Sequence, residues 1–154
     1  MSHQPTIRAA GPDDIENLLD LYAQMTPNQQ RCPPEVATDI LTRFEKYDGS
    51  AILLAEVDKT LVASCALIIV PNLTRGGAPF ALIENVVTDT GHRRQGYGKL
   101  ILNAATDRAW QCGCYKVMLL AGSLEPSILS FYERAGFAQS KTGFQMRRSP
   151  KRTA

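Results

Sequence analysis

The sequence predicts a protein of the α/β (α+β) class, in which one mixed sheet carries helices on its faces. Three observations support this prediction: segments of strand and helix character alternate, a short hairpin connection joins two apolar strands in the middle, and a strongly periodic helix follows them. The 154 residues suit a single domain over 1–154, and the polar end 149–154 is expected to be a frayed tail.

The first third of the chain predicts one strand and two helices. Residues 5–10 are expected to form a short strand, and Asp13 or Asp14 in the following turn can cap a helix. The apolar residues of that helix follow helical spacing: Ile15, Leu18, Leu19, Tyr22 and Met25. A second helix is expected to begin near residues 33–37 and to end near Lys46, where the helix dipole favours a cation.

The middle of the chain predicts three strands. Residues 51–57 and 61–70 are rich in β-branched and apolar residues, and the connection 58–60 is short enough for a hairpin. Residues 71–79 are expected to form a loop. Residues 80–88 form the third strand of this group, and Glu84 is expected to share a buried face with Phe80, Leu82 and Val86.

The last third predicts a helix, a strand, a helix and two closing strands. The first helix carries one stripe of small and apolar residues: Gly98, Ile101, Leu102, Ala105, Ala109 and Cys112. Gly113 can end this helix, and residues 114–122 are expected to form a buried strand. Residues 126–136 form a short helix, and 137–140 and 144–148 pair as the closing strands.

Composition excludes several classes of protein. The formal net charge of +2 is too small for a general nucleic-acid binder. No apolar run approaches the roughly 20 residues of a membrane span, and the N-terminus lacks the apolar core of a signal peptide, so we expect a cytoplasmic protein. Four isolated or closely spaced cysteines and two histidines do not match a zinc or disulfide framework, so reduced, mostly buried thiols and no metal are expected.

The stretch HRRQGYGKL, residues 92–100, predicts an anion-binding loop. Amides at the start of a helix have no intrahelical acceptor and lie at the positive end of its dipole, so a phosphate is their natural ligand. Arg93, Arg94 and Lys99 would add charge-assisted contacts, although a solvated helix start is the alternative. The glycine spacing matches neither a Walker loop nor the dinucleotide fingerprint, which would need glycine in place of Ile101.

The remaining pattern is R-x-x-G-x-G, from Arg93 to Gly98, between a strand and a helix. It resembles the acyl-CoA-binding motif of the GNAT superfamily of N-acetyltransferases, as IENVVT before it and SFYERAGF after it also do. The resemblance implies a mostly antiparallel sheet of about six to seven strands, with two splayed central parallel strands and about four helices. The second half is further similar to glucosamine-6-phosphate N-acetyltransferases, in LIENVVTDTGHRRQGYGKLIL, GCYKVML, FYERAGF and FQMRR.

The same resemblance implies acetyl-CoA as cosubstrate and assigns its contacts. The backbone of Val86, Val87 and Thr88 would hold the pantetheine arm and the acetyl carbonyl. The pyrophosphate would be bound by the side chains of Arg93 and Arg94 and by five backbone amides, which are those of Gln95, Gly96, Tyr97, Gly98 and Lys99. It also implies that two copies can pair as a homodimer.

By resemblance, Tyr132 in SFYERAGF protonates the departing CoA thiolate. A tyrosine of pKa about 10 can protonate a thiolate whose conjugate acid has a pKa of about 8.5. Simple aromatic packing of Tyr132 is the alternative. Glu84 is implied to accept the amine proton or bind the acceptor, unless it is a structural carboxylate near a bulge. Glu125 stands where many relatives carry asparagine, and His92 is expected to be a turn residue.

The acceptor is expected to be a small-molecule amine. Its pocket should lie among the first two helices, the loop 71–79 and the closing strands, which contain Tyr22, Arg31, Arg43, Arg75 and Phe144. Three functions remain open: a small-molecule N-acetyltransferase, a glucosamine-6-phosphate N-acetyltransferase in particular, and a non-catalytic acyl-CoA-binding sensor. A nucleic-acid-binding protein fits the net charge poorly.

Overall fold

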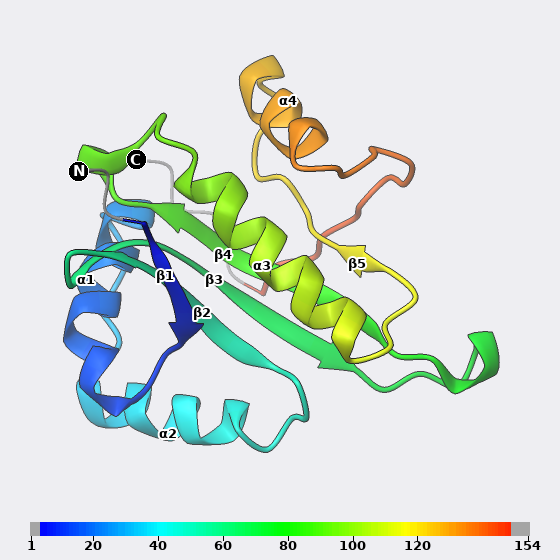
Figure 1. Ribbon diagram of the computed structural model, residues 1–154, viewed down its shortest axis with the longest axis horizontal. Helices are drawn as coiled ribbons and strands as arrows, with labels where there is room; N and C mark the ends of the chain where they lie inside the picture. Colours follow the sequence, from blue (N-terminus) through cyan, green and yellow to red (C-terminus); the bar gives the residue numbers. More distant parts are fainter. Residues whose placement is uncertain (1–3, 149–154) are drawn as a thin grey trace.

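The computed structural model describes residues 4–148, and the expected tail 149–154 lies outside the described residues. The strands are β1 Thr6–Ala9, β2 Ala51–Val57, β3 Thr60–Val70, β4 Phe80–Thr88 and β5 Val117–Met118. The helices are α1 Ile15–Met25, α2 Pro34–Phe44, α3 Tyr97–Gln111 and α4 Pro126–Arg134 (Figure 1). Short 3-10 turns lie at Pro12–Asp14, Arg75–Gly77 and Thr90–His92.

The strands form one mixed sheet in the order β1-β2-β3-β4-β5. Each neighbouring pair is antiparallel except β4 and β5, which are parallel. The hairpin between β2 and β3 has a two-residue loop, Asp58 and Lys59, whose φ angles are 49° and 63°. Two left-handed residues in a row match the right-handed twist of the strands, so the predicted hairpin is confirmed.

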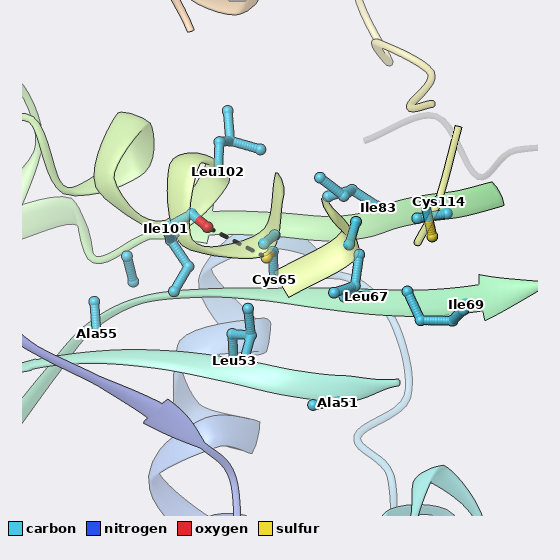
Figure 2. Packing of buried hydrophobic residues seen from close by; sticks show 14 of the residues in the cluster. Ala51, Leu53, Ala55, Cys65, Leu67, Ile69, Ile83, Ile101, Leu102 and Cys114 are labelled. Carbon is cyan, nitrogen blue, oxygen red and sulfur yellow. Dashed lines mark hydrogen bonds between the residues drawn. The ribbon is translucent and has the colours of Figure 1, made fainter. Parts of the chain in front are cut away.

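Helices cover both faces of the sheet, as predicted, and each face has its own core. On one face, α3 packs Ile101 and Leu102 against Leu53, Leu67 and Ile83 of the strands (Figure 2). On the other face, α1 and α2 pack against a smaller set of strand residues: Ile52, Leu54 and Ala66. The predicted stripe of α3 is confirmed from Gly98 to Ala109, because the buried residues of the helix are Gly98, Ile101, Leu102, Ala105 and Ala109. Cys112, the last predicted member, lies just past the end of the helix and is half-buried. Gly113 ends this helix with a left-handed φ of 79°.

The predicted buried strand over 114–122 is wrong in its length and burial. Only Val117 and Met118 pair with β4, and both side chains are half-buried. Leu120 is 65% exposed. The strand is short because the chain after Met118 diverges from β4 toward α4 (Figure 1). A strand with no neighbour on its outer side also gains little from burial.

The two predicted closing strands are also wrong, because residues 137–148 contain no strand. Their alternating apolar pattern has no surface to pack against: Phe144 is 92% exposed and Met146 is 99% exposed. The sheet over residues 4–148 therefore has five strands rather than about six to seven. As a result, the parallel pair β4 and β5 lies at one edge of this sheet and not at its centre.

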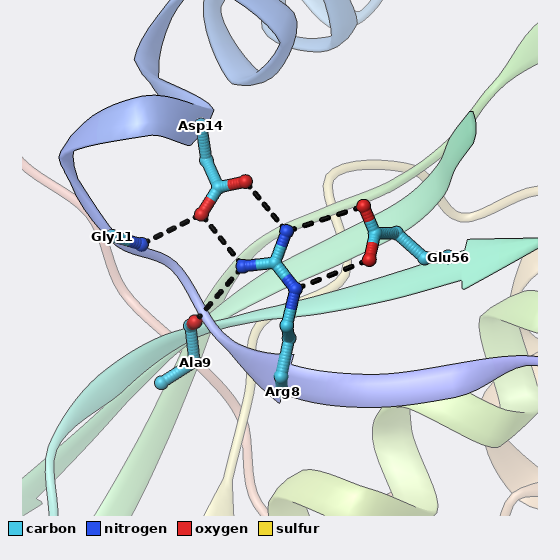
Figure 3. A network of polar contacts seen from close by, with 5 residues as sticks. All are labelled: Arg8, Ala9, Gly11, Asp14 and Glu56. Carbon is cyan, nitrogen blue, oxygen red and sulfur yellow. Dashed lines mark hydrogen bonds and ion pairs between the residues drawn. The ribbon is translucent and has the colours of Figure 1, made fainter. Parts of the chain in front are cut away.

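An ion-pair network fixes the beginning of the chain against the sheet (Figure 3). The Arg8 guanidinium donates to Asp14 Oδ2 at 2.7 Å and to Glu56 Oε1 at 3.1 Å. Asp14 directly precedes α1, but its carboxylate accepts from the Gly11 N–H at 2.7 Å and does not cap the helix. Asp14 thus closes the turn before α1, which differs from the predicted cap.

We expect Asp14→Asn to lower the free energy of unfolding at pH 7 by about 1–3 kcal/mol, because it removes a charge-assisted pair. The hydrogen bonds from Arg8 lower the pKa of Asp14 below its ordinary value of 3.8. The stability that this carboxylate contributes is therefore present above pH 3.8 and is lost as the pH falls through the lower, folded-state pKa. Urea unfolding at pH 7 and near pH 2.5 measures this, with the exposed neighbour substitution Asp13→Asn as control. Equal stability of Asp14→Asn and the wild type at pH 7 would contradict the prediction.

Candidate active site

The parallel strands β4 and β5 part after a very short pairing. Ala81 pairs with Val117 and Leu82 with Met118, and no later residue of β4 pairs with β5. Over residues 83–88, β4 therefore has no strand neighbour on the edge that faces away from β3, within the part of the chain that the structure describes. This stretch includes the three residues predicted to hold the pantetheine arm, Val86, Val87 and Thr88. A free strand edge offers backbone N–H and C=O groups to an extended ligand.

A bulge in β4 changes which residues share a face. Ser64 of β3 pairs with Val87 and Ala66 pairs with Glu84, so Asn85 and Val86 together oppose one residue of β3. Asn85 has a left-handed φ of 53°. Because a bulge interrupts the alternation of side chains, Val86 packs against the α3-side core, as Ile83 does.

The bulge corrects the expectation for Glu84. Glu84 does not share a buried face with Val86, and its side chain is exposed. Its pairing partner Ala66 packs in the α1 and α2 core, so Glu84 belongs to that face of the sheet. Because Glu84 is exposed, its carboxylate bears no cost of burial. What remains is an exposed carboxylate at a bulge, on the side of the helices expected to form the acceptor pocket.

The predicted phosphate loop leads directly from β4 into α3. Arg93, Arg94, Gln95 and Gly96 are exposed, and neither arginine forms an ion pair with a described residue. Gly96 begins the helix with a left-handed φ of 86°, and a Cβ placed there would meet no atom within 4 Å. The backbone is therefore open to a ligand at this point.

The amides of the first turn of α3 are available to such a ligand. The first bond into the helix runs from the Leu100 N–H to the Gly96 C=O at 3.0 Å. The preceding amides of Tyr97, Gly98 and Lys99 have no intrahelical acceptor. These free amides and the nearby arginines fit an anionic group such as a pyrophosphate.

Gly98 has a further, steric role. A Cβ on Gly98 would lie 3.0 Å from Phe131 Cζ and 3.3 Å from Thr88 Oγ1. The first turn of α3, the end of β4 and α4 therefore meet at this glycine. This contact brings α4 and its Tyr132 to the free edge of β4.

Tyr132 lies half-buried between two aromatic rings, with centroid distances of 5.0 Å to Phe131 and 6.4 Å to Phe137. Burial raises the pKa of Tyr132 above its ordinary value of 10.0, and the negative charge of Glu84 raises it further by a smaller amount. The hydroxyl is therefore protonated at neutral pH and available as a proton donor. Tyr132 packs against the α3-side core, whereas Glu84 belongs to the α1 and α2 face of the sheet.

The five residues expected around the acceptor have different surroundings. Arg31 is already neutralised by Asp20 at 2.8 Å and Glu16 at 3.1 Å, and Arg75 lies 5.4 Å from the Tyr115 ring centroid. Phe144 is 92% exposed.

Two of the five remain as candidates for acceptor contacts. Arg43 lines a cavity of about 260 Å³ together with Phe44, Tyr47 and Ile68. The Tyr22 hydroxyl is buried beside Ser64, and burial raises its pKa to about 12.

The remaining candidates do not suggest other chemistry. All four cysteines are free thiols, of which Cys65 and Cys114 are buried, and burial raises the pKa of Cys65 to about 12. Among residues 4–148, no group of three or more histidine, cysteine, aspartate or glutamate side chains is arranged to bind a metal ion. Glu125 is exposed just before α4, where its N–H donates to Ser123 Oγ at 3.1 Å.

Two residues near the loop were missed by the sequence argument. Asp89 follows β4 and accepts hydrogen bonds from the Gly91 N–H at 3.0 Å and from Gln24 of α1 at 2.8 Å. An aspartate two residues before a glycine is a common turn pattern, which was a usable signal for Asp89. Gln24 gave no signal, because its partner lies 65 residues away in the sequence. His92 lies in the turn Thr90–His92, as expected, and contacts the same carboxylate.

The chain belongs to the acetyltransferase (GNAT) family, whose profile matches residues 15–137, and it is therefore an acyltransferase. Members of this family use acetyl-CoA as cosubstrate. Among curated proteins, the glucosamine 6-phosphate N-acetyltransferase of Trypanosoma brucei brucei is 31% identical over 131 residues, which cover 85% of this chain and 87% of that protein.

Solved structures share the fold over nearly the whole chain. A protein of Agrobacterium tumefaciens strain C58, given as a candidate acetyltransferase, is 42% identical with a TM-score of 0.87, and the match covers 93% of this chain and 99% of that one. Glucosamine-6-phosphate N-acetyltransferase of Arabidopsis thaliana has a TM-score of 0.85 at 23% identity, over 95% of this chain and 99% of that one. The described residues contain no helix that is long and apolar enough to cross a membrane.

Proposed function

We propose that the protein transfers the acetyl group of acetyl-CoA to the primary amine of a small molecule by direct attack. One observation carries this proposal: β4 leaves its parallel partner after Leu82 and continues, unpaired on that edge, into the open glycine loop that begins α3. A free strand edge next to a helix N-terminus suits a ligand with an extended amide-bearing arm and a pyrophosphate. Acetyl-CoA has both.

In this proposal acetyl-CoA is bound by backbone groups of β4 and the loop and by two positively charged side chains. The unpaired groups of Val86, Val87 and Thr88 hold the pantetheine arm, and the amides of residues 95–99 hold the pyrophosphate. Arg93 and Arg94 add charge-assisted contacts, and both are exposed and free of ion pairs with described residues.

The chemistry follows from the two titratable groups at this edge. The amine nitrogen attacks the thioester carbonyl carbon, the C–S bond breaks, and the Tyr132 hydroxyl gives its proton to the departing sulfur. An amide near Val86 or Val87 stabilises the oxyanion. Glu84 accepts the proton that the amine loses, directly or through water. Its exposure on the face of α1 and α2 supports this assignment.

We expect Glu84→Gln to lower kcat/KM for the amine by roughly 10- to 100-fold near pH 7, because general base catalysis is removed. The deficit should narrow as the pH approaches the pKa of the acceptor, since more of the amine is then already neutral. Initial rates between pH 6.5 and 9.5 measure this, with Asp107→Asn as the control on another exposed carboxylate. A pH-independent deficit accompanied by a lower melting temperature would assign Glu84 a structural role instead.

Glucosamine 6-phosphate is the second, more specific candidate for the acceptor. The 31% identical relative from Trypanosoma brucei brucei, whose name gives this substrate, supports it. Arg43, which no described acidic residue pairs with, is available to an anionic group on the acceptor. Steady-state assays with acetyl-CoA and a panel of amino sugars, polyamines, amino acids and peptides test the proposal. If glucosamine 6-phosphate is turned over no faster than the other amines, this candidate is wrong.

The competing function is a non-catalytic acyl-CoA sensor in the cytoplasm. It would bind acetyl-CoA without turnover of any amine, and calorimetry beside the acceptor panel separates the two functions. No binding of acetyl-CoA at all would reject both.

A further inference from the structure

A glutamine of α1 is hydrogen-bonded to the segment that enters the predicted pyrophosphate loop. Gln24 Nε2 donates to Asp89 Oδ1 at 2.8 Å, and Gln24 Oε1 accepts from the Thr90 N–H at 2.8 Å. Both polar atoms of one side chain therefore contact consecutive residues of this segment. The two partners are 65 and 66 residues away in the sequence.

Asp89 is the centre of this contact. Its second carboxylate oxygen accepts from the Gly91 N–H at 3.0 Å and contacts His92 Nδ1 at 2.7 Å. Its own N–H donates to the Val62 C=O of β3 at 2.8 Å. Residues 89–92 are thus tied to α1 on one side and to the sheet on the other, immediately before Arg93.

We propose that Gln24 and Asp89 are positioning residues that hold the loop 93–96 in the shape that binds the pyrophosphate of acetyl-CoA. This inference rests on the proposed function, and neither residue is assigned a contact with the ligand.

The loop 93–96 needs such support because its backbone angles and its adjacent positive charges both disfavour a single ordered conformation. Arg94 and Gly96 have left-handed φ angles of 61° and 86°, and the conformation of Arg94 is unfavourable for a residue with a side chain. Arg93 and Arg94 are adjacent like charges without a described counter-ion. A loop held in its binding conformation before the ligand arrives loses less conformational entropy on binding.

Substitutions can remove the hydrogen bond between Gln24 and Asp89, or restore it with donor and acceptor exchanged. Gln24→Ala removes two hydrogen bonds, and Gln24→Glu places a carboxylate against Asp89. In the double variant Gln24→Glu/Asp89→Asn, the new amide at position 89 can donate to the new carboxylate at position 24. That carboxylate can still accept from the Thr90 N–H, and the net charge of the pair is that of the wild type. Asn17→Ala, on an exposed site of α1, is the matched control.

Each variant is assayed with acetyl-CoA and with S-acetylpantetheine, a donor that lacks the pyrophosphate. We expect KM for acetyl-CoA to rise about 3-fold in Gln24→Ala and about 10-fold in Gln24→Glu, and to return to within about 2-fold of wild type in the double variant. The kcat/KM for S-acetylpantetheine and the KM for the amine should stay unchanged.

Two results would overturn the inference alone: an unchanged KM for acetyl-CoA in Gln24→Glu, or an equal loss with both donors together with a lower melting temperature. The second result would mean that Gln24 only supports the fold. A wild-type protein that neither bound nor used acetyl-CoA would overturn the proposed function and this inference with it.

Discussion

Tyr132→Phe is expected to lower kcat by roughly 100-fold or more, because in the proposed mechanism the departing thiolate loses its proton donor. The Kd for acetyl-CoA should change by less than about twofold, since phenylalanine keeps the ring contacts with Phe131 and Phe137. Burial and the charge of Glu84 raise the pKa of Tyr132, so the wild-type kcat should not fall from loss of this proton until the pH exceeds the ordinary value of 10.0. Stopped-assay rates and calorimetry on the same preparations measure both quantities.

Tyr115→Phe is the matched control, because Tyr115 is 37% exposed and is not part of the proposed site. It should keep wild-type kcat and Kd. An unchanged kcat in Tyr132→Phe would show that another group, or water, protonates the sulfur, and Tyr132 would then be an aromatic packing residue.

Arg94→Glu is expected to raise the Kd for acetyl-CoA by about 10- to 100-fold at low salt. The change replaces a favourable contact with phosphate by a repulsive one, beside the positive end of the α3 dipole. The effect should shrink as salt rises, because Arg94 is exposed and its interactions are screened. Calorimetry at two ionic strengths measures it.

Lys46→Glu makes the same change of charge at an exposed position beyond the end of α2 and serves as control. Equal effects of the two substitutions would mean that only the overall charge matters. Unaltered binding by Arg94→Glu would remove the phosphate contact assigned to this arginine.

The parts of the fold that could be predicted are those with local causes. The stripe from Gly98 to Ala109 is set by helical periodicity, and the start of α3 is set by a glycine at a left-handed angle. The hairpin at Asp58 and Lys59 depends on two residues and their twist. Each of these signals lies within one short segment, so the sequence alone could carry it.

The errors occurred where a segment depends on a neighbour far away in the chain. The pattern around Phe144 and Met146 favours a strand, yet residues 137–148 find no strand to pair with, and both side chains are exposed. The face assigned to Val86 was wrong, because one bulge at Asn85 shifts every later side chain of β4, and Glu84 itself is exposed and not buried. Nothing in the sequence of residues 80–88 predicts the bulge, because the bulge depends on how this strand pairs with β3.

The candidate site was predicted in its parts but not in its support. The loop, β4 and Tyr132 each lie in a motif that resembles the family, and the family itself is confirmed, whereas the roles of these residues stay predictions. Gln24 carries no motif, because its role depends on how α1 lies against the end of β4.

The close approach at Gly98 also restricts how this protein can diversify. A methyl group there would lie 3.0 Å from Phe131, the neighbour of Tyr132, and 3.3 Å from the Thr88 hydroxyl at the end of β4. A change at position 98 therefore bears on the proposed donor site and on the placement of the proposed proton donor in one mutational step. Libraries that vary this glycine should randomise position 131 with it, because the Phe131 ring would have to move by a few tenths of an ångström.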